Sequence, residues 1–156
     1  MEKKPISRAG FDALIKELKD LKEVQRPEIL KTVQWARSLG DLSENADYSA
    51  AKEKQRQIDK RIGYIEGIIE NASVIDVDSL SGDRVVFGAR VELEDEDGNK
   101  MKCQILSDIE SDGRTVISCT SPVGRALIGK CVGDSCVVRL PSGEKEYEIL
   151  DVKFKE

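Results

Sequence analysis

Three carboxylate side chains, Asp41, Glu44 and Asp47, lie close together in the first half of the chain. Asp41 and Glu44 are three residues apart, so near a turn both side chains can point the same way. No lysine or arginine occurs between Ser38 and Ala51. Exposed carboxylates suit a magnesium ion, and they can also orient or deprotonate a water molecule. The cluster is therefore the part of this sequence best equipped for chemistry.

The cluster does not make a complete active site by itself. A few acids at an open turn offer too few ligands to hold magnesium tightly, and nothing there excludes water. Acids near the start of a helix also stabilise the helix dipole, so Glu44 could simply be a cap. Two features favour a function: Leu42 is apolar where a turn needs no apolar residue, and basic residues flank the cluster, Arg37 before it and Lys52 after it. An ordinary solvated helix face would explain the basic flanks equally well.

Apolar residues on both sides of the cluster predict two helices that fold back on each other. They recur at intervals of three or four, which is the spacing of a coiled-coil seam. The first series is Phe11, Leu14, Leu18 and Leu21, and the second is Ile58, Ile62, Ile65, Ile69 and Ala72. Opposite members of the two series have residue numbers that add to 83, and an antiparallel hairpin requires such a constant sum. The turn then falls between Asp41 and Leu42, and the same rule pairs Trp35 with Tyr48 in an aromatic layer below it.

The ends of these helices are marked by capping residues. Ser7 is the expected N-cap of the first helix, and Gly40 is the expected stop signal at its other end. The second helix should begin near residues 43–44.

Pro27 interrupts the first helix. Proline lacks an N–H group, and it disfavours helical geometry in the residue before it, which is Arg26. We therefore expect a kink there. The seam also loosens at this point, since Gln25 and Glu28 occupy positions where the spacing calls for apolar residues.

The second half of the chain changes to the two-residue alternation of strands. The expected strands, separated by turn-forming residues, cover 91–94, 101–106, 115–119, 136–140 and 147–154. Within the last of these the apolar phase flips between Ile149 and Leu150, which indicates a β-bulge. Ser121 and Pro122 have the types expected at the N-cap and first position of a short helix that ends at Gly129.

The predicted fold class is α+β. An antiparallel coiled-coil hairpin covers residues 1–75, and a small, largely antiparallel sheet domain covers residues 76–156. The charged fraction of 35% and the aromatic fraction of 4% suit a long solvated helical element better than a compact enzyme. Residues 1–74 carry 14 Lys/Arg and 13 Asp/Glu, and the remainder carries 11 and 17, giving net charges of +1 and −6. Because phosphate repels an acidic surface, any contact with nucleic acid should come from the first half.

The four cysteines all lie in the second half. Cys103, Cys119, Cys131 and Cys136 lack the Cys-x-x-Cys spacing of zinc sites, and the chain has no histidine. Cys103 and Cys119 fall on the apolar faces of expected strands, so we expect reduced thiols in a core. The N-terminus lacks an apolar signal segment, and no apolar run is long enough to span a bilayer. We therefore expect a cytoplasmic protein without a membrane partner.

Two segments match signatures of a known family. The first runs from Gly40 to Tyr48 and reads Gly-Asp-Leu-Ser-Glu-Asn-Ala-Asp-Tyr; the second runs from Ser121 to Lys130. They resemble the tip signature and the C-terminal signature of the Gre family of bacterial transcript cleavage factors. The resemblance covers essentially the whole chain, with one signature in each expected domain, so chance is a poor explanation for it.

The resemblance implies a C-terminal domain of FKBP-like fold that docks at the rim of the RNA polymerase secondary channel through Ser121 and Pro122. The coiled coil would reach through that channel to the polymerase active centre. In backtracked complexes Asp41 and Glu44 would there help to hold the second Mg²⁺ and position the attacking water. The polymerase would then cut nascent RNA near its 3′ end and resume elongation. The chain would be a monomeric activator of this cleavage, with no cofactor of its own and no enzymatic activity by itself.

Other residues take supporting roles in this reading. The resemblance assigns Arg37 and Lys52 to a basic patch that faces the RNA 3′ segment. The expected supports of the tip are Leu42, Asn45, Tyr48 and Trp35. A modest basic patch favours the GreA-like branch of the family, which releases short products.

Three alternatives remain open at this point. Some members of such a family occupy the channel and inhibit transcription, although they rearrange the tip acids, whereas this chain keeps the Asp-x-x-Glu spacing. An FKBP-like fold also suggests a prolyl isomerase, but that activity needs an aromatic-lined pocket, and residues 78–156 contain only Phe87, Tyr147 and Phe154. A plain coiled-coil adaptor would make the tip acids replaceable.

Overall fold

The structure is a computed structural model that describes residues 3–41 and 44–155. The chain divides into two compact units: Phe11–Ala72 form the first, and Lys3–Gly10 together with the chain from Ser73 onward form the second. The sequence did not indicate that the N-terminal segment groups with the second unit. No helix in the described parts of the chain is long and apolar enough to cross a membrane.

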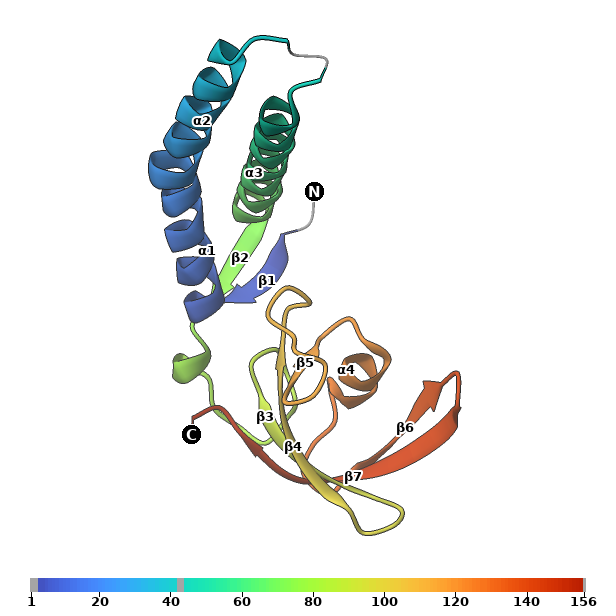
Figure 1. Ribbon diagram of the computed structural model, residues 1–156. Coiled ribbons are helices and arrows are strands. Elements are labelled where there is room, and N and C mark those ends of the chain that lie inside the picture. Colours follow the sequence, from blue (N-terminus) through green and yellow to red (C-terminus); the bar gives the residue numbers. More distant parts are fainter. Residues whose placement is uncertain (1–2, 42–43, 156) are drawn as a thin grey trace. The chain divides into compact units, whose positions relative to one another are not determined.

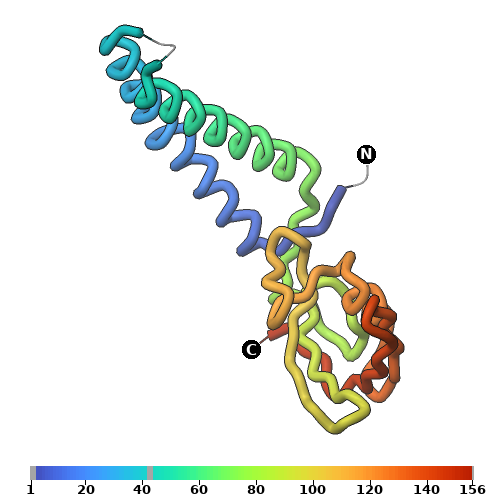
Figure 2. The backbone as a smooth tube through the Cα atoms, turned by 45° about the vertical axis from the view of Figure 1, so that its right-hand side comes forward, coloured from blue at the N-terminus to red at the C-terminus, as the bar shows by residue number. Residues whose placement is uncertain are grey.

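The first unit is an antiparallel helical hairpin (Figures 1 and 2). Its first arm consists of α1 (Arg8–Asp20), a π-helical segment (Leu21–Gln25) and α2 (Arg26–Ser38), and its second arm is α3 (Ala46–Glu70). The buried apolar residues of the two arms are Leu14, Leu21, Ile29, Val33 and Ala36 on one side and Ala51, Ile58, Ile62 and Ile65 on the other. This confirms the predicted hairpin and most of its seam. Exposed ion pairs also join the arms, and each contributes little to stability: Glu17–Arg61, Lys22–Glu66 and Arg26–Asp59.

The helix passes Pro27 in a way that the sequence did not predict. Arg26 keeps helical geometry, with φ −66° and ψ −47°, so its expected departure from the helical region is wrong. Its N–H donates to the carbonyl of Leu21, five residues back, as in a π-helix. The wider turn lies directly before the proline, whose missing N–H and bulky ring do not fit a regular α-helical turn.

The second unit contains a five-stranded sheet of order β5-β4-β3-β7-β6. The strands are β3 (Arg90–Asp95), β4 (Lys100–Leu106), β5 (Val116–Ser118), β6 (Ser135–Leu140) and β7 (Gly143–Lys153), and the short helix α4 (Pro122–Leu127) follows β5. Neighbouring strands are antiparallel except β4 and β5, which are parallel. The sheet is therefore largely antiparallel, as the turns predicted, with one parallel pair at its β5 edge.

The core of this unit lies on one face of the sheet. Its fully buried residues include Leu93, Ile105, Leu127 and Ile149. On β3, Glu92 faces Asp151 of β7 while the next residue, Leu93, faces Ile149, so β7 holds an extra residue there. This is the β-bulge that the phase flip predicted.

The cysteines are free thiols, as predicted. Cys103 and Cys136 are buried, while Cys119 and Cys131 are partly buried. Burial raises the pKa of Cys103 to about 11, which keeps this thiol protonated and unreactive near neutral pH.

The segment before α1 forms an unexpected strand. β1 (Lys4–Ser7) pairs with β2 (Ala72–Ile75) in a separate two-stranded sheet. Ser7 then caps α1, because the N–H of Gly10 donates to its hydroxyl oxygen at 3.0 Å. The predicted N-cap is thereby confirmed.

One carboxylate fastens this segment to the rest of the second unit. Glu110 accepts hydrogen bonds from the hydroxyl of Ser7 and, at 2.6 Å, from the hydroxyl of Ser107. Both serines are buried. A side chain at Gly10 would collide with the same carboxylate, so the first turn of α1 contains a glycine where Glu110 approaches.

Glu110→Ala should destabilise the protein by about 1–3 kcal/mol, because it leaves two buried hydroxyl groups without their acceptor. Urea unfolding followed by circular dichroism measures the change. Asp108→Ala, at an exposed position two residues away, is the matched control and should have little effect. Equal effects of the two substitutions would contradict the role of Glu110.

Gly10→Ala tests the same contact through the direction in which it changes the free energy of unfolding. Alanine normally stabilises a helix by about 1 kcal/mol relative to glycine. Here we expect destabilisation in the wild-type chain and stabilisation in the Glu110→Ala background, measured by the same unfolding experiment. Stabilisation in both backgrounds would mean that Glu110 does not crowd Gly10.

Candidate functional site

The chain turns sharply where α2 ends at Ser38. The N–H of Gly40 donates to the carbonyl of Arg37 at 3.2 Å, and Gly40 has φ +85°, a left-handed conformation that suits glycine. This confirms Gly40 as the stop signal. Asp41 follows with φ +25°, which aspartate tolerates better than most residues.

Asn45 closes the turn from the other side. Its Nδ2 donates to the carbonyl oxygens of Ala36 at 2.7 Å and Gly40 at 3.2 Å. Its Oδ1 accepts from the N–H of Tyr48 at 3.0 Å, which makes it the N-cap of α3. One amide thus satisfies carbonyls at the end of α2 and an N–H at the start of α3. α3 begins at Ala46, slightly later than predicted.

The two spaced acids lie in this turn. Asp41 and Glu44 are both exposed, and the N–H of Glu44 donates to the carbonyl of Asp41 at 3.3 Å. Asp47 is exposed in the first turn of α3. Because Asn45 caps the helix, the alternative in which Glu44 serves as the N-cap is wrong. Leu42, an expected tip support, lies outside the described residues, so its role stays a prediction.

Arg37 and Tyr48 meet across the hairpin just below the turn. The Arg37 guanidinium carbon lies 5.8 Å from the centre of the Tyr48 ring, within cation–π range. A hydrogen bond from Arg37, together with the positive charges of Arg37, Lys52 and Arg56, lowers the pKa of Tyr48. The structure therefore brings the predicted basic residues Arg37 and Lys52 to opposite arms around one aromatic ring.

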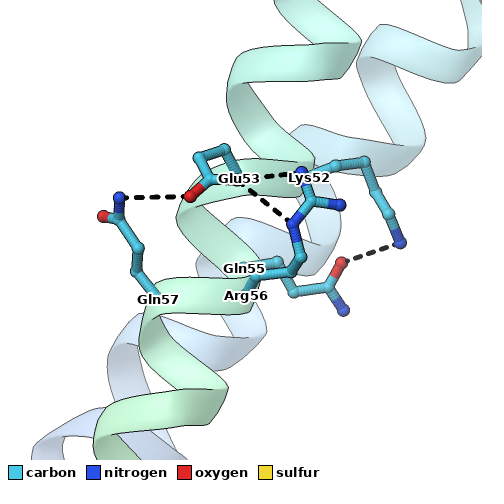
Figure 3. A network of polar contacts seen from close by, with 5 residues as sticks. All are labelled: Lys52, Glu53, Gln55, Arg56 and Gln57. Carbon is cyan, nitrogen blue, oxygen red and sulfur yellow. Dashed lines mark hydrogen bonds and ion pairs between the residues drawn. The ribbon is translucent and has the colours of Figure 1, made fainter.

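Neighbouring residues on α3 order the basic side chains (Figure 3). Lys52 Nζ donates to Gln55 Oε1 at 3.2 Å. Arg56 forms an ion pair with Glu53 at 2.9 Å. Lys52 takes part in no ion pair among the residues that the structure describes. Its charge is therefore better available to an anionic partner than that of Arg56.

Trp35 does not occupy the predicted aromatic layer. Its side chain is 55% exposed, whereas Ala36 is fully buried between the arms. The π-helical segment adds one residue before α2. The residue that faces the other arm here is therefore Ala36, one position later than the spacing predicted. Trp35 therefore does not brace the turn, and Tyr48 packs with Arg37 instead.

Ser121 and Pro122 open α4, as predicted. The hydroxyl of Ser121 donates to the carbonyl of Ser118 at 2.7 Å and accepts from the N–H of Gly124 at 3.1 Å. A side chain at Gly124 would collide with the same Ser118 carbonyl, so this loop is tightly packed. Ser121 shapes the loop, while Pro122 is exposed on it.

The chain thus combines a capped helical hairpin that carries acids in its turn with a unit built on a five-stranded sheet, and family models of transcription elongation factors match both parts of the chain. Residues 4–74 match the family model "Transcription elongation factor, N-terminal", and residues 80–154 match "Transcription elongation factor, GreA/GreB, C-term". The chain therefore belongs to the GreA/GreB family of transcription elongation factors.

Similar proteins span nearly the same length as this chain. Transcription elongation factor GreA of Anaeromyxobacter sp. (strain K) is 52% identical, and the match covers 100% of this chain and 95% of that protein. Transcription elongation factor GreA of Helicobacter pylori (strain ATCC 700392 / 26695) is 45% identical, and the match covers 100% of this chain and 96% of that protein. Among solved structures, the GreA factor homolog 1 (Gfh1) protein of Thermus thermophilus is 29% identical over 97% of this chain and 99% of that chain, with a TM-score of 0.46.

Substitutions at Asn45 should separate its two roles. Serine keeps an N-cap acceptor but loses the hydrogen bonds from Nδ2 to the carbonyls of Ala36 and Gly40, so Asn45→Ser should destabilise the hairpin by about 1–2 kcal/mol. Asn45→Ala should cost about 1 kcal/mol more through loss of the cap. Thermal unfolding followed by Trp35 fluorescence measures this, since Trp35 is the sole tryptophan and lies in the hairpin. Wild-type stability in Asn45→Ser would contradict the link to α2.

Arg37→Ala should raise the pKa of Tyr48 toward its ordinary value of about 10, because the hydrogen bond and the nearest positive charge are lost. An NMR titration of the tyrosine ring carbons measures this pKa. Arg56→Ala is the control and should give a smaller rise, since Arg56 acts only through its more distant charge. A pKa of Tyr48 that does not change in Arg37→Ala would rule out the contact.

Proposed function

We propose that this protein binds RNA polymerase and stimulates the polymerase's own cleavage of backtracked nascent RNA. The observation that carries the proposal is the exposed pair Asp41 and Glu44, held in one turn between two capped helices. An acid pair in an open turn needs a second protein to complete a site. Such a role belongs in the cytoplasm, where transcription occurs in bacteria.

The donor set of the turn fits a shared magnesium ion. Carboxylate oxygens are the ligands that Mg²⁺ prefers, and it commonly keeps only one or two carboxylates together with water and substrate phosphates. Among the described residues, no three acidic or cysteine side chains converge on a metal-sized site. Asp41 and Glu44 would therefore supply two ligands and the polymerase the others. A second metal ion in such a site stabilises the attacking oxygen in phosphoryl transfer.

The acids also have a role that does not depend on ligation. A carboxylate within hydrogen-bonding distance of a water molecule orients that water and accepts its proton. Asp41 and Glu44 are suited to this because both are exposed. The backbone hydrogen bond from Glu44 to Asp41 keeps the two acids close together, which favours their joint action on one water molecule.

The basic residues below the turn suit the RNA. Arg37 and Lys52 lie on opposite arms and flank the Tyr48 ring. Phosphate is attracted to the cations, and the aromatic ring offers a face on which a base can stack. We assign the RNA 3′ segment to this patch and the docking contact with polymerase to the α4 loop around Pro122.

The central test measures RNA cleavage in a stalled elongation complex that carries 3′- or 5′-labelled RNA. The wild-type protein should release short 3′ fragments. Asp41→Asn and Glu44→Gln should each lower the cleavage rate at least a hundredfold with little change in polymerase binding, because both replace a charged carboxylate by a neutral amide of the same size. Asp47→Asn, which neutralises a neighbouring exposed acid, is the matched control and should cleave at nearly the wild-type rate.

The outcomes of this test are distinct. Wild-type cleavage by the Asp41→Asn, Glu44→Gln double variant would refute a role for the turn. A wild-type protein that binds and slows elongation without cleavage would identify an inhibitor instead. Cleavage of free RNA in magnesium without polymerase would show that the chain is itself a nuclease, against the proposal.

The docking assignment has its own prediction. Ser121→Ala loses both hydrogen bonds that shape the α4 loop, and Pro122→Ala removes an exposed contact. Both should raise the protein concentration needed for half-maximal cleavage several-fold, while the rate at saturation stays the same. Ser142→Ala, at an exposed turn between β6 and β7, is the control. An unchanged half-maximal concentration would show that the loop is not the docking contact.

A further inference from the structure

The second unit has a hollow on the face of its sheet opposite the core. Its volume is about 450 Å³, within the range of small-molecule sites. Residues of β3, β4, β5 and β7 line it, with Lys155 just beyond the end of β7. Val91, Cys103 and Val152 are buried in the core, so alternate residues on these strands face outward into the hollow.

The outward-facing residues form two rows across the sheet. The strand register places Gln104 of β4, Arg90 of β3 and Lys153 of β7 side by side in the first row. This row contains amide, guanidinium and ammonium groups, and the Gln104 amide also donates to the carbonyl of Gly88 at 3.3 Å. The second row consists of Lys102, Glu92 and Asp151, again side by side. The hollow therefore has one side rich in donors and another that contains two carboxylates.

The charges of the hollow oppose those of the unit around it. Residues 75–156 carry a net charge of −6, yet four cations and two acids line this hollow: Arg90, Lys102, Lys153, Lys155, Glu92 and Asp151. Lys153 pairs with Asp151 at 3.7 Å. Within the described residues, Lys102 and Lys155 take part in no ion pair. Two cations thus remain for an anionic ligand.

The rim of the hollow is ordered before any ligand binds. Asp112 accepts from the N–H groups of Arg114 and Thr115 at 2.8 Å and of Val116 at 2.9 Å. Thr115 and Val116 line the hollow. These bonds, with one from the Thr115 hydroxyl, hold the pKa of Asp112 well below its usual range, so the loop keeps this arrangement across physiological pH.

We propose that this hollow binds a small phosphorylated sugar. The phosphate groups lie over Lys155 and the neighbouring Lys153, and Lys102 adds positive charge from the second row. The sugar hydroxyls donate to Glu92 and Asp151, which a bare phosphate cannot do. The site goes beyond the proposed function, since neither the hairpin turn nor the α4 loop takes part in it.

The test is an NMR titration of the ¹⁵N-labelled full-length protein with adenosine triphosphate, ribose 5-phosphate and pyrophosphate. We expect the two sugar phosphates to shift the amide signals of the two rows and of Thr115, with a dissociation constant below about 1 mM for the nucleotide. Pyrophosphate should bind at least tenfold more weakly than the nucleotide. Absence of shifts at these residues would overturn the proposal, as would pyrophosphate binding as tightly as the nucleotide.

Two variants locate the binding. Lys102→Glu combined with Lys153→Glu should raise the dissociation constant of the nucleotide at least tenfold. Lys145→Glu, on β7 outside the hollow, reverses an exposed charge on the same strand and should change it less than twofold. Equal weakening by both would show general attraction to charge rather than a site. Glu92→Gln should weaken ribose 5-phosphate but not pyrophosphate, and equal effects on the two would overturn the role of the carboxylates.

Discussion

Pro27 is the residue on which the geometry of the hairpin end depends. It has no N–H group, and its ring does not fit against the carbonyl four residues before it in a regular helix. The π-helical segment Leu21–Gln25 accommodates it with one extra residue in the turn. One extra residue rotates everything after it by about 100° around the helix axis. The seam therefore runs through Ile29 and Ala36 rather than through the positions one residue earlier.

This rotation decides which side chains reach the turn. With Ala36 buried, its carbonyl lies within hydrogen-bonding distance of Asn45 Nδ2, and Arg37 lies beside Tyr48. Without the extra residue Trp35 would fill the space between the arms. A bulky ring there would occupy the place where the small Ala36 lets the chains approach closely enough for Asn45 to join them. The contacts of Asn45 with Ala36 and of Arg37 with Tyr48 thus follow from a proline well below them in the first arm.

The same residue marks the limit of what the sequence could predict. The seam before Pro27 and the seam of α3 follow from the regular spacing of their apolar residues. The bulge in β7 follows from the one-residue shift of the strand alternation at Leu150. A π-helical turn breaks the period without changing any residue type, so the exposure of Trp35 could not be derived. The Ser7–Glu110 contact was also missed, since it joins short polar residues far apart in the chain. The positions of Asp41 and Glu44 were predictable from spacing, but the way Asn45 fixes them was not.

The exposure of the acid pair has a physical consequence for control. Two carboxylates in an open turn bind magnesium weakly, because water competes for the ion and too few ligands surround it. Under the proposed function, the protein therefore cannot cleave RNA in solution, and activity arises only where a partner supplies the remaining ligands and excludes water. The hairpin contributes what the partner lacks, namely two carboxylates that a capped helix end brings close together. Asn45 serves that end by holding the last carbonyls of α2 and the first turn of α3 with one side chain.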